Sequence, residues 1–284
     1  MSKIMIGTDE VLKVMFGLDE VSSLSMGGET IPITPPTPPA PDYSTMPFTI
    51  EALESGNFNI NLAGVDYSTD DGNNWDTTTG VTTFNLSEGD AVQFKRNSQT
   101  TAQGMFSGNT AITFNVYGNI MSLLYGDNFI GEVTLNQSAV FSYLFNGSSV
   151  VDVSELHLPA LTLANYCYQR MFYDCTNLTI APSILPALTL TNYCYSEMFY
   201  GCTNLTIAPE LPATTLVASC YQAMFRGSSK LQYIKCMATN NADGAYTNMW
   251  VRNISATGTF VKDANATWPS GRSGIPTGWT VVDA

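Results

Sequence analysis

Apolar residues recur in short pairs near the start of the chain. Residues 3–32 divide into three blocks of ten, in each of which two apolar residues spaced two apart precede a glycine. This alternation followed by a turn residue predicts short strands joined by tight turns. The pairs are Ile4 and Ile6, Val14 and Phe16, and Leu24 and Met26. Three such strands are too small a sheet to be stable alone, so residues 1–31 are predicted to anchor the chain on a partner; an N-terminal tail without fixed structure is the alternative.

A proline-rich stretch and a strand-forming region come next. Residues 32–41 hold six prolines, which predicts a polyproline II spacer, and we assign residues 32–45 to a linker. Over residues 46–118, apolar and polar positions alternate in short runs separated by turn residues such as Asp71-Gly72. This pattern is typical of a β-sandwich-like module.

The most regular pattern lies between residues 141 and 240. A Met-Phe pair recurs at 171–172, 198–199 and 224–225, and a degenerate first copy has Leu and Phe at 144–145. A period of 26 to 27 residues predicts a solenoid, in which stacked coils bury the Leu, Met and Phe side chains of their neighbours. We expect each Tyr-x-x-Met-Phe segment to form one or two helical turns before a short strand.

The outer copies of the repeat depart from the inner ones. The first copy has Leu144 and Ser148 where the inner copies have Met and Cys, and the last copy has Ser228 and Lys230. A regular coil at either end would expose its apolar side to water, so we predict that these two copies are caps.

The six cysteines follow the repeat. Cys167, Cys194 and Cys220 occupy one repeat position, and Cys175 and Cys202 occupy another. A free thiol is a small side chain suited to a tight buried corner, so a structural role is predicted. Disulfides and a metal site are the alternatives, although one cysteine at each position per coil does not give the paired short spacing of zinc ligands.

The charge of the chain excludes several classes of function. Only 12% of residues are charged and the formal net charge is −13; residues 1–150 hold 4 basic and 16 acidic residues. The chain lacks the basic patch that binds nucleic acid or an anionic membrane surface, and no apolar run is long enough to span a bilayer. The N-terminus lacks the apolar core of a signal peptide, so export by that route is not expected.

Catalytic signatures are sparse. The single histidine, His157, lies between two leucines and is predicted to be structural; no nucleophile elbow, phosphate loop, dinucleotide fingerprint or metal motif occurs. We therefore predict no enzyme activity, no catalytic residue, no metal and no cofactor. One alternative that stays open is a pair of carboxylates of the kind that glycosidases use. The other is a calcium site near Asp70 and Asp71, although a loop beginning at Asp66 does not match the EF-hand pattern at its glycine and last-ligand positions.

Tyrosines recur within the repeats and are the candidate binding residues. A flat aromatic ring that is exposed can stack on the apolar face of a sugar. The candidates are Tyr166, Tyr173, Tyr193 and Tyr200. The alternative is that the tyrosine rings pack between coils, since a periodic ladder suits coil stacking equally well.

The repeat has a family resemblance. The pattern Cys-Tyr-x-x-Met-Phe-x-x-Cys-Thr-Asn-Leu-Thr over about 141–240 resembles BspA-like leucine-rich repeats, with Leu-Pro-Ala-x-Thr-Leu as an additional piece. The N-terminal blocks, Gly118 to Gly126, the repeats and the ending Gly258 to Trp279 together resemble fibre and spike proteins of Bacteroidetes (crAss-like) phages. The resemblance implies a virion structural protein, a head or tail fibre that attaches through residues 1–31 to capsid or tail proteins and adheres to the host surface or its glycans.

The complete prediction is a mainly β protein in five parts. These are the N-terminal anchor (1–31), the linker (32–45), the β-sandwich-like module (46–118), a leucine-rich-repeat solenoid of four coils with caps and short helical turns (119–240), and a capping segment (241–284). We expect a homo-oligomer, dimer or trimer, located in the virion and assembled in the cytoplasm of the bacterial host. A bacterial surface adhesin with BspA-like repeats is the alternative, and a glycan-degrading enzyme is a third class.

Overall fold

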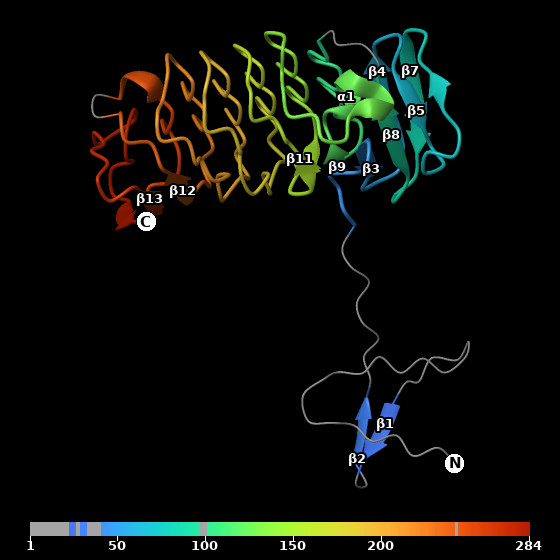
Figure 1. Ribbon diagram of the computed structural model, residues 1–284, viewed down its shortest axis with the longest axis horizontal. Helices are drawn as coiled ribbons and strands as arrows, with labels where there is room; N and C mark the ends of the chain where they lie inside the picture. The colour runs from blue at the N-terminus through green and yellow to red at the C-terminus, as the bar shows by residue number, and fades with distance from the viewer. Residues whose placement is uncertain (1–22, 27–28, 33–40, 97–100, 242–243) are drawn as a thin grey trace. The chain divides into compact units, whose positions relative to one another are not determined.

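The computed structural model describes residues 23–26, 29–32, 41–96, 101–241 and 244–284, and it divides into the compact units Met1–Pro41 and Asp42–Ala284 (Figure 1). This division falls within the predicted linker.

In the first unit, β1 (Ser23–Met26) pairs antiparallel with β2 (Glu29–Pro32). The third block of ten therefore contains two strands, whereas the sequence pattern predicted one, because the residues after the Gly-Gly pair return alongside those before it. The predicted anchor residues Leu24 and Met26 lie in β1. The other four, Ile4, Ile6, Val14 and Phe16, lie outside the described residues.

The second unit is mainly β, with several sheets, none of which closes on itself in the described residues. Its strands are β3 (Phe48–Ala52), β4 (Gly56–Asn61), β5 (Asp66–Ser68), β6 (Asp76–Thr77), β7 (Val81–Leu86), β8 (Ala91–Lys95), β9 (Phe114–Asn119), β10 (Val150–Asp152), β11 (Leu156–His157), β12 (Tyr233–Cys236), β13 (Thr259–Lys262) and β14 (Thr280–Asp283). Its helical segments are α1 (Ser122–Tyr125) and the 3₁₀ turns η1 (Gly126–Asn128) and η2 (Ala245–Thr247). None of these described helices has the length and apolarity to cross a bilayer.

Two sheets share one apolar core at the N-terminal side of this unit. The larger has the order β10-β9-β3-β8-β5-β6, with β11 also pairing with β9, and the smaller is the hairpin β4-β7. Alternate side chains of β4 and β7 are buried, as the alternating sequence predicted. Phe58 of β4 packs edge-on against Phe114 of β9, with ring centroids 5.1 Å apart, so the hairpin packs on the larger sheet.

Strand β9 joins this sheet core to the repeats. It pairs antiparallel with β3 on one side and parallel with β10 and β11, which belong to the first repeat. The predicted boundaries at 118/119 and 240/241 both fall inside the compact unit Asp42–Ala284, and hydrogen bonds continue across them.

The repeats are built from turn segments that lie one above the next (Figure 1). In the described chain these turn segments are residues 102–108, 139–147, 166–174, 193–201, 219–227 and 245–253. Backbone N–H groups alternate in direction. The N–H groups of Tyr168 and Arg170 donate to the next segment, at Cys194 and Ser196, whereas that of Gln169 donates three residues back within its own segment.

This geometry replaces the predicted helical turns. Every fourth residue has left-handed backbone geometry; in one segment these are Tyr166, Arg170 and Asp174, with φ of 60°, 55° and 55°. A helix would direct every N–H along its own axis, whereas these turns use half of them to bind the neighbouring segment. Glycine occupies the last left-handed position in four other segments (Gly108, Gly147, Gly201 and Gly227), where its lack of Cβ favours positive φ.

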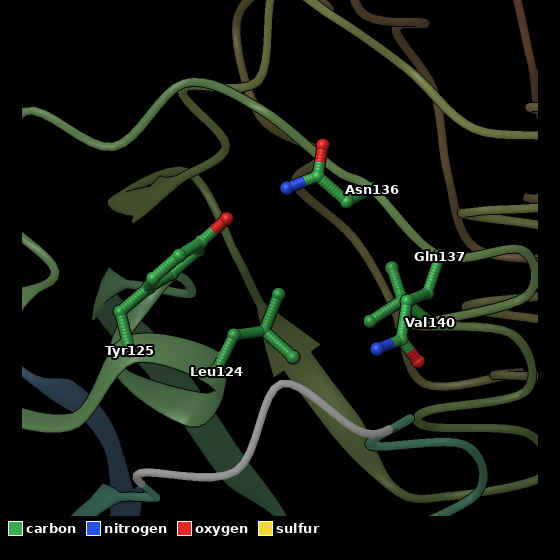
Figure 2. Close-up of a pocket in the computed structure, with 5 residues that line it drawn as sticks. All are labelled: Leu124, Tyr125, Asn136, Gln137 and Val140. Atoms are coloured by element: carbon green, nitrogen blue, oxygen red, sulfur yellow. The ribbon is translucent and has the colours of Figure 1, made fainter.

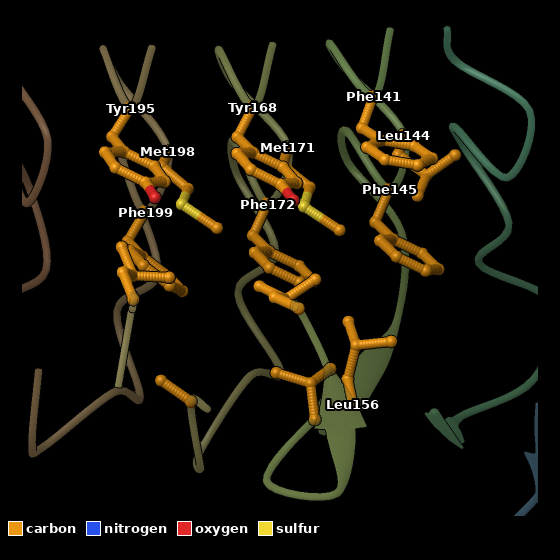
Figure 3. Close-up of a cluster of buried hydrophobic side chains, with 14 of the residues drawn as sticks. Phe141, Leu144, Phe145, Leu156, Tyr168, Met171, Phe172, Tyr195, Met198 and Phe199 are labelled. Carbon is orange, nitrogen blue, oxygen red and sulfur yellow. The ribbon is translucent and has the colours of Figure 1, made fainter. Parts of the chain in front are cut away.

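The repeated apolar residues form buried columns (Figure 3). Met171, Met198 and Met224 are fully buried, and their carbonyls accept bonds from Phe145, Phe172 and Phe199. The predicted burial of the repeated Met and Phe side chains is confirmed. The phenylalanine rings form a column with neighbouring ring centroids 5.3 to 5.8 Å apart; in chain order these are Phe145, Phe172, Phe199 and Phe225.

The predicted caps at the outer copies are wrong. Leu144, Ser148 and Ser228 are buried, because a further turn segment covers each outer copy. Segment 102–108 places Phe106 against Phe145, with ring centroids 5.5 Å apart. At the other end, Trp250 of segment 245–253 packs on both Tyr221 and Phe225, so one indole joins two aromatic columns, and the Trp268 ring stacks on Trp250 in turn.

All six cysteines are free and buried, as the structural interpretation required. The thiols of Cys175 and Cys202 donate to the carbonyls of Phe145 and Phe172, both at 3.0 Å. The Ser228 hydroxyl donates to the corresponding carbonyl of Phe199 at 2.8 Å, which explains why serine replaces cysteine at this position.

Candidate functional site

The candidate site is the outward side of the turn segments. We name it the tyrosine–arginine face, because the side chains that point away from the core at equivalent positions are mostly of these two kinds. Its members are Tyr143, Tyr166, Arg170, Tyr173, Tyr193, Glu197, Tyr200, Ser219, Arg226, Met249 and Arg252. All are exposed or partly exposed, in contrast to Tyr168, Tyr195 and Tyr221, which are about 1% exposed and belong to the core.

The four predicted tyrosines form two stacked pairs on this face. Tyr166 and Tyr193 lie with ring centroids 4.8 Å apart and planes 11° apart. Tyr173 and Tyr200 lie 4.5 Å apart with planes 8° apart. The structure therefore brings the predicted residues together by pairs in adjacent turn segments.

The second pair is closed on both sides by arginines. The guanidinium carbon of Arg170 lies 5.4 Å from the centre of the Tyr173 ring, and that of Arg226 lies 5.4 Å from the centre of the Tyr200 ring. Cation–π contacts of this kind stabilise partly exposed rings. Tyr173 and Tyr200 consequently have no free ring face for a sugar, which corrects the expectation for these two residues.

Arg170 is further fixed by its neighbours. It donates hydrogen bonds to the hydroxyl of Tyr143 and to a carboxylate oxygen of Glu197, the latter at 3.0 Å. The charge of Arg170 is thus neutralised within the face.

The first pair keeps a free ring face. The residue equivalent to Tyr193 in the next turn segment is Ser219, which has the same left-handed backbone, and the equivalent residue before Tyr166 is Ala139. Neither small side chain can cover an aromatic ring. Among the described residues, the single ring contact of Tyr193 is with Tyr166, so the opposite side of the Tyr193 ring faces the space above Ser219.

Arg226 and Arg252 form a second feature that the sequence patterns did not single out. They occupy equivalent positions in adjacent segments, and one guanidinium nitrogen of each lies 3.8 Å from the same sulfur atom, that of Met249. No ion pair joins either of them to a carboxylate in the described part of the chain. The repeat offset of 26 residues could have revealed that they align.

The remaining polar groups are occupied in structural roles. His157 lies half-buried in β11, where burial lowers its pKa and Asp42 opposes that change. Burial raises the pKa of Cys175 to about 12, so the thiol is protonated at neutral pH. A carboxylate oxygen of Asp70 accepts bonds from Ser68 and Asn74 within a turn, and the described residues hold no group of three or more His, Cys, Asp or Glu side chains able to bind a metal.

A small pocket lies between α1 and the first repeat (Figure 2). It is lined by Leu124, Tyr125, Asn136, Gln137 and Val140. The hydroxyl of Tyr125 donates to the carbonyl of Thr134 at 2.8 Å, so the one ionisable group of the lining is already used. This pocket offers neither an acid–base pair nor a nucleophile.

Comparison with known proteins adds no assignment. No family model matches the chain, and neither the curated proteins nor the solved structures give a match.

Proposed function

We propose that this chain is a structural protein of a phage virion, a head or tail fibre that attaches through its N-terminus and adheres to the host surface. The finer fold we propose is a leucine-rich-repeat solenoid. The observation that carries the proposal is the tyrosine–arginine face, which repeats in successive turn segments of a unit that is compact by itself and follows a proline-rich stretch.

Adhesion would follow from repetition. Equivalent side chains in adjacent segments, such as Tyr166 and Tyr193, offer similar contacts at short fixed intervals. Several weak contacts on one rigid surface, and several copies on one particle, combine through effective concentration into firm attachment. Homo-oligomerisation through residues 1–31 would multiply the copies further.

Binding is favoured over catalysis by the state of the reactive side chains. The six thiols are buried, and the pocket of Figure 2 lacks any acid–base pair. Catalysis requires polarised groups gathered around a substrate. The tyrosine–arginine face, in contrast, is suited to recognition.

The proposal is tested on purified particles. Deletion of residues 1–32 removes most of the first compact unit and leaves Asp42–Ala284 intact. We expect the truncated protein to keep the circular dichroism spectrum and thermal midpoint of the second unit, while mass spectrometry no longer detects it in particles. Incorporation of the truncated protein would contradict the anchor. Absence of the full-length protein from particles, with its detection on the bacterial surface, would favour the adhesin alternative.

A further inference from the structure

The end of the tyrosine–arginine face near Arg226 has an excess of positive charge. The protein has a formal net charge of −13, yet Arg226 and Arg252 lie side by side, each 3.8 Å from the sulfur of Met249. A thioether sulfur is a weak acceptor and carries no charge, so it does not offset the repulsion between two guanidinium groups.

The carboxylates of the same face do not neutralise this pair. Glu197 is bound to Arg170. Asp174 lies against Gly201, and it forms no ion pair in the described residues. Two adjacent guanidinium groups with free N–H donors are the arrangement that binds a carboxylate or sulfate by charge-assisted hydrogen bonds.

The open ring face of Tyr193 lies close to these arginines along the chain. It looks onto Ser219, which belongs to the same turn segment as Arg226 and precedes it by seven residues. The ring offers an apolar surface, and its hydroxyl can hydrogen-bond. A ligand that combines a pyranose ring with a negative charge on a neighbouring unit matches both features.

We propose that the surface formed by Tyr193, Ser219, Arg226 and Arg252 binds an acidic polysaccharide. One sugar ring stacks on Tyr193 above Ser219, and a carboxylate or sulfate of a nearby sugar is held between the two guanidinium groups. This inference rests on the proposed adhesive function and gives it a ligand class.

The experiment measures binding of the full-length chain by isothermal titration calorimetry. The probes are hexasaccharides of hyaluronan, polygalacturonate and chondroitin sulfate, together with the carboxyl-reduced forms of the first two. We expect at least one acidic probe to bind, its neutral counterpart to bind about tenfold or more weakly, and raised salt to weaken binding further.

Matched variants locate the site. Arg226→Gln combined with Arg252→Gln should weaken binding of the acidic probe about tenfold or more, since charge-assisted hydrogen bonds are lost. Lys230→Gln combined with Lys235→Gln removes the same charge from β12 and the segment before it and should leave binding unchanged. Tyr193→Ser should weaken binding, whereas Tyr233→Ser, which removes a partly exposed tyrosine from β12 outside the tyrosine–arginine face, should preserve it.

Each other outcome overturns the inference. It fails if none of the three acidic probes binds more tightly than millimolar, or if neither hyaluronan nor polygalacturonate binds more tightly than its carboxyl-reduced form. It also fails if the lysine pair matters as much as the arginine pair, or if vesicles of phosphatidylglycerol bind while the oligosaccharides do not. Such a result would leave the virion proposal standing, because that depends on particle composition. Equal adhesion of particles with and without the protein would instead overturn the proposed function.

Discussion

Stacking between neighbouring turn segments makes a specific energetic prediction. The Phe172 ring is fully buried and lies 5.3 Å from Phe145 on one side and 5.4 Å from Phe199 on the other. Each aromatic pair contributes about 0.5–1.5 kcal/mol beyond its buried area. Phe172→Leu breaks two pairs while keeping an apolar side chain, so the pair contribution lost from the free energy of unfolding is about 1–3 kcal/mol.

A double-mutant cycle isolates the contact. Phe172→Leu and Phe199→Leu both remove the pair that these two residues share, so the double variant should be less destabilised than the sum of the singles by about 0.5–1.5 kcal/mol. The matched cycle uses Phe145 and Phe199, which are separated by Phe172 and should be additive within about 0.5 kcal/mol.

Urea unfolding followed by tryptophan fluorescence and circular dichroism measures both cycles, with equal m-values as the condition for comparing free energies. Equal coupling in the two cycles, or no coupling between Phe172 and Phe199, would refute the layered packing.

Three further predictions concern the buried thiols and the left-handed turns. Burial raises the thiol pKa to about 12 for Cys175 and about 11 for Cys220, so as the pH rises the unfolded chain releases these protons before the folded chain does. The free energy of unfolding, constant below about pH 8, should therefore fall between pH 9 and 12 by up to ~1.4 kcal/mol per group and pH unit. A urea midpoint independent of pH over that range would contradict this. Cys175→Ser should be nearly neutral because Ser228 makes the same bond, whereas Cys175→Ala should cost about 1–2 kcal/mol in urea melts; equal losses would argue against the hydrogen bond. Gly201→Ala should cost about 1–2 kcal/mol from its φ of 71° and more from collision with the Asp174 carboxylate. Adding Asp174→Ala, which removes the carboxylate but keeps a Cβ at this left-handed position, should recover only the collision part in thermal melts; no recovery would place the strain elsewhere.

The period of the repeat and the burial of its apolar side chains could be predicted from the sequence, because both depend on which residues recur. Met171, Met198 and Met224 had to share a buried column once their spacing was constant. The backbone conformation was not readable in the same way. A Tyr-x-x-Met-Phe segment has ordinary helix formers, and only the glycines at 147, 201 and 227 signal a left-handed position.

The flanking turn segments were missed for different reasons. Met105-Phe106 resembles the repeat, but β9 and α1 lengthen the interval to the next copy, so the fixed period fails there. In the last segment, Trp250 takes the place of the repeated Met and packs on the last ring of two columns at once. Likewise, the sequence left open whether the four tyrosines were exposed or packed between coils, and the arginines that close Tyr173 and Tyr200 are visible only when adjacent segments are superposed.

The alternating direction of the backbone N–H groups limits how such a protein can change length. Within a turn segment, moving the chain by one residue would exchange the bonds that serve the neighbour with those that close the turn, and would point buried side chains at water. A shift by one whole repeat keeps both the backbone hydrogen bonds and the burial of the side chains. Duplication or loss of one whole repeat is therefore the tolerated step, while the connecting loops absorb the difference between 26 and 27 residues. A population of related chains should accordingly differ in reach by whole turn segments, each adding another row to the outward face.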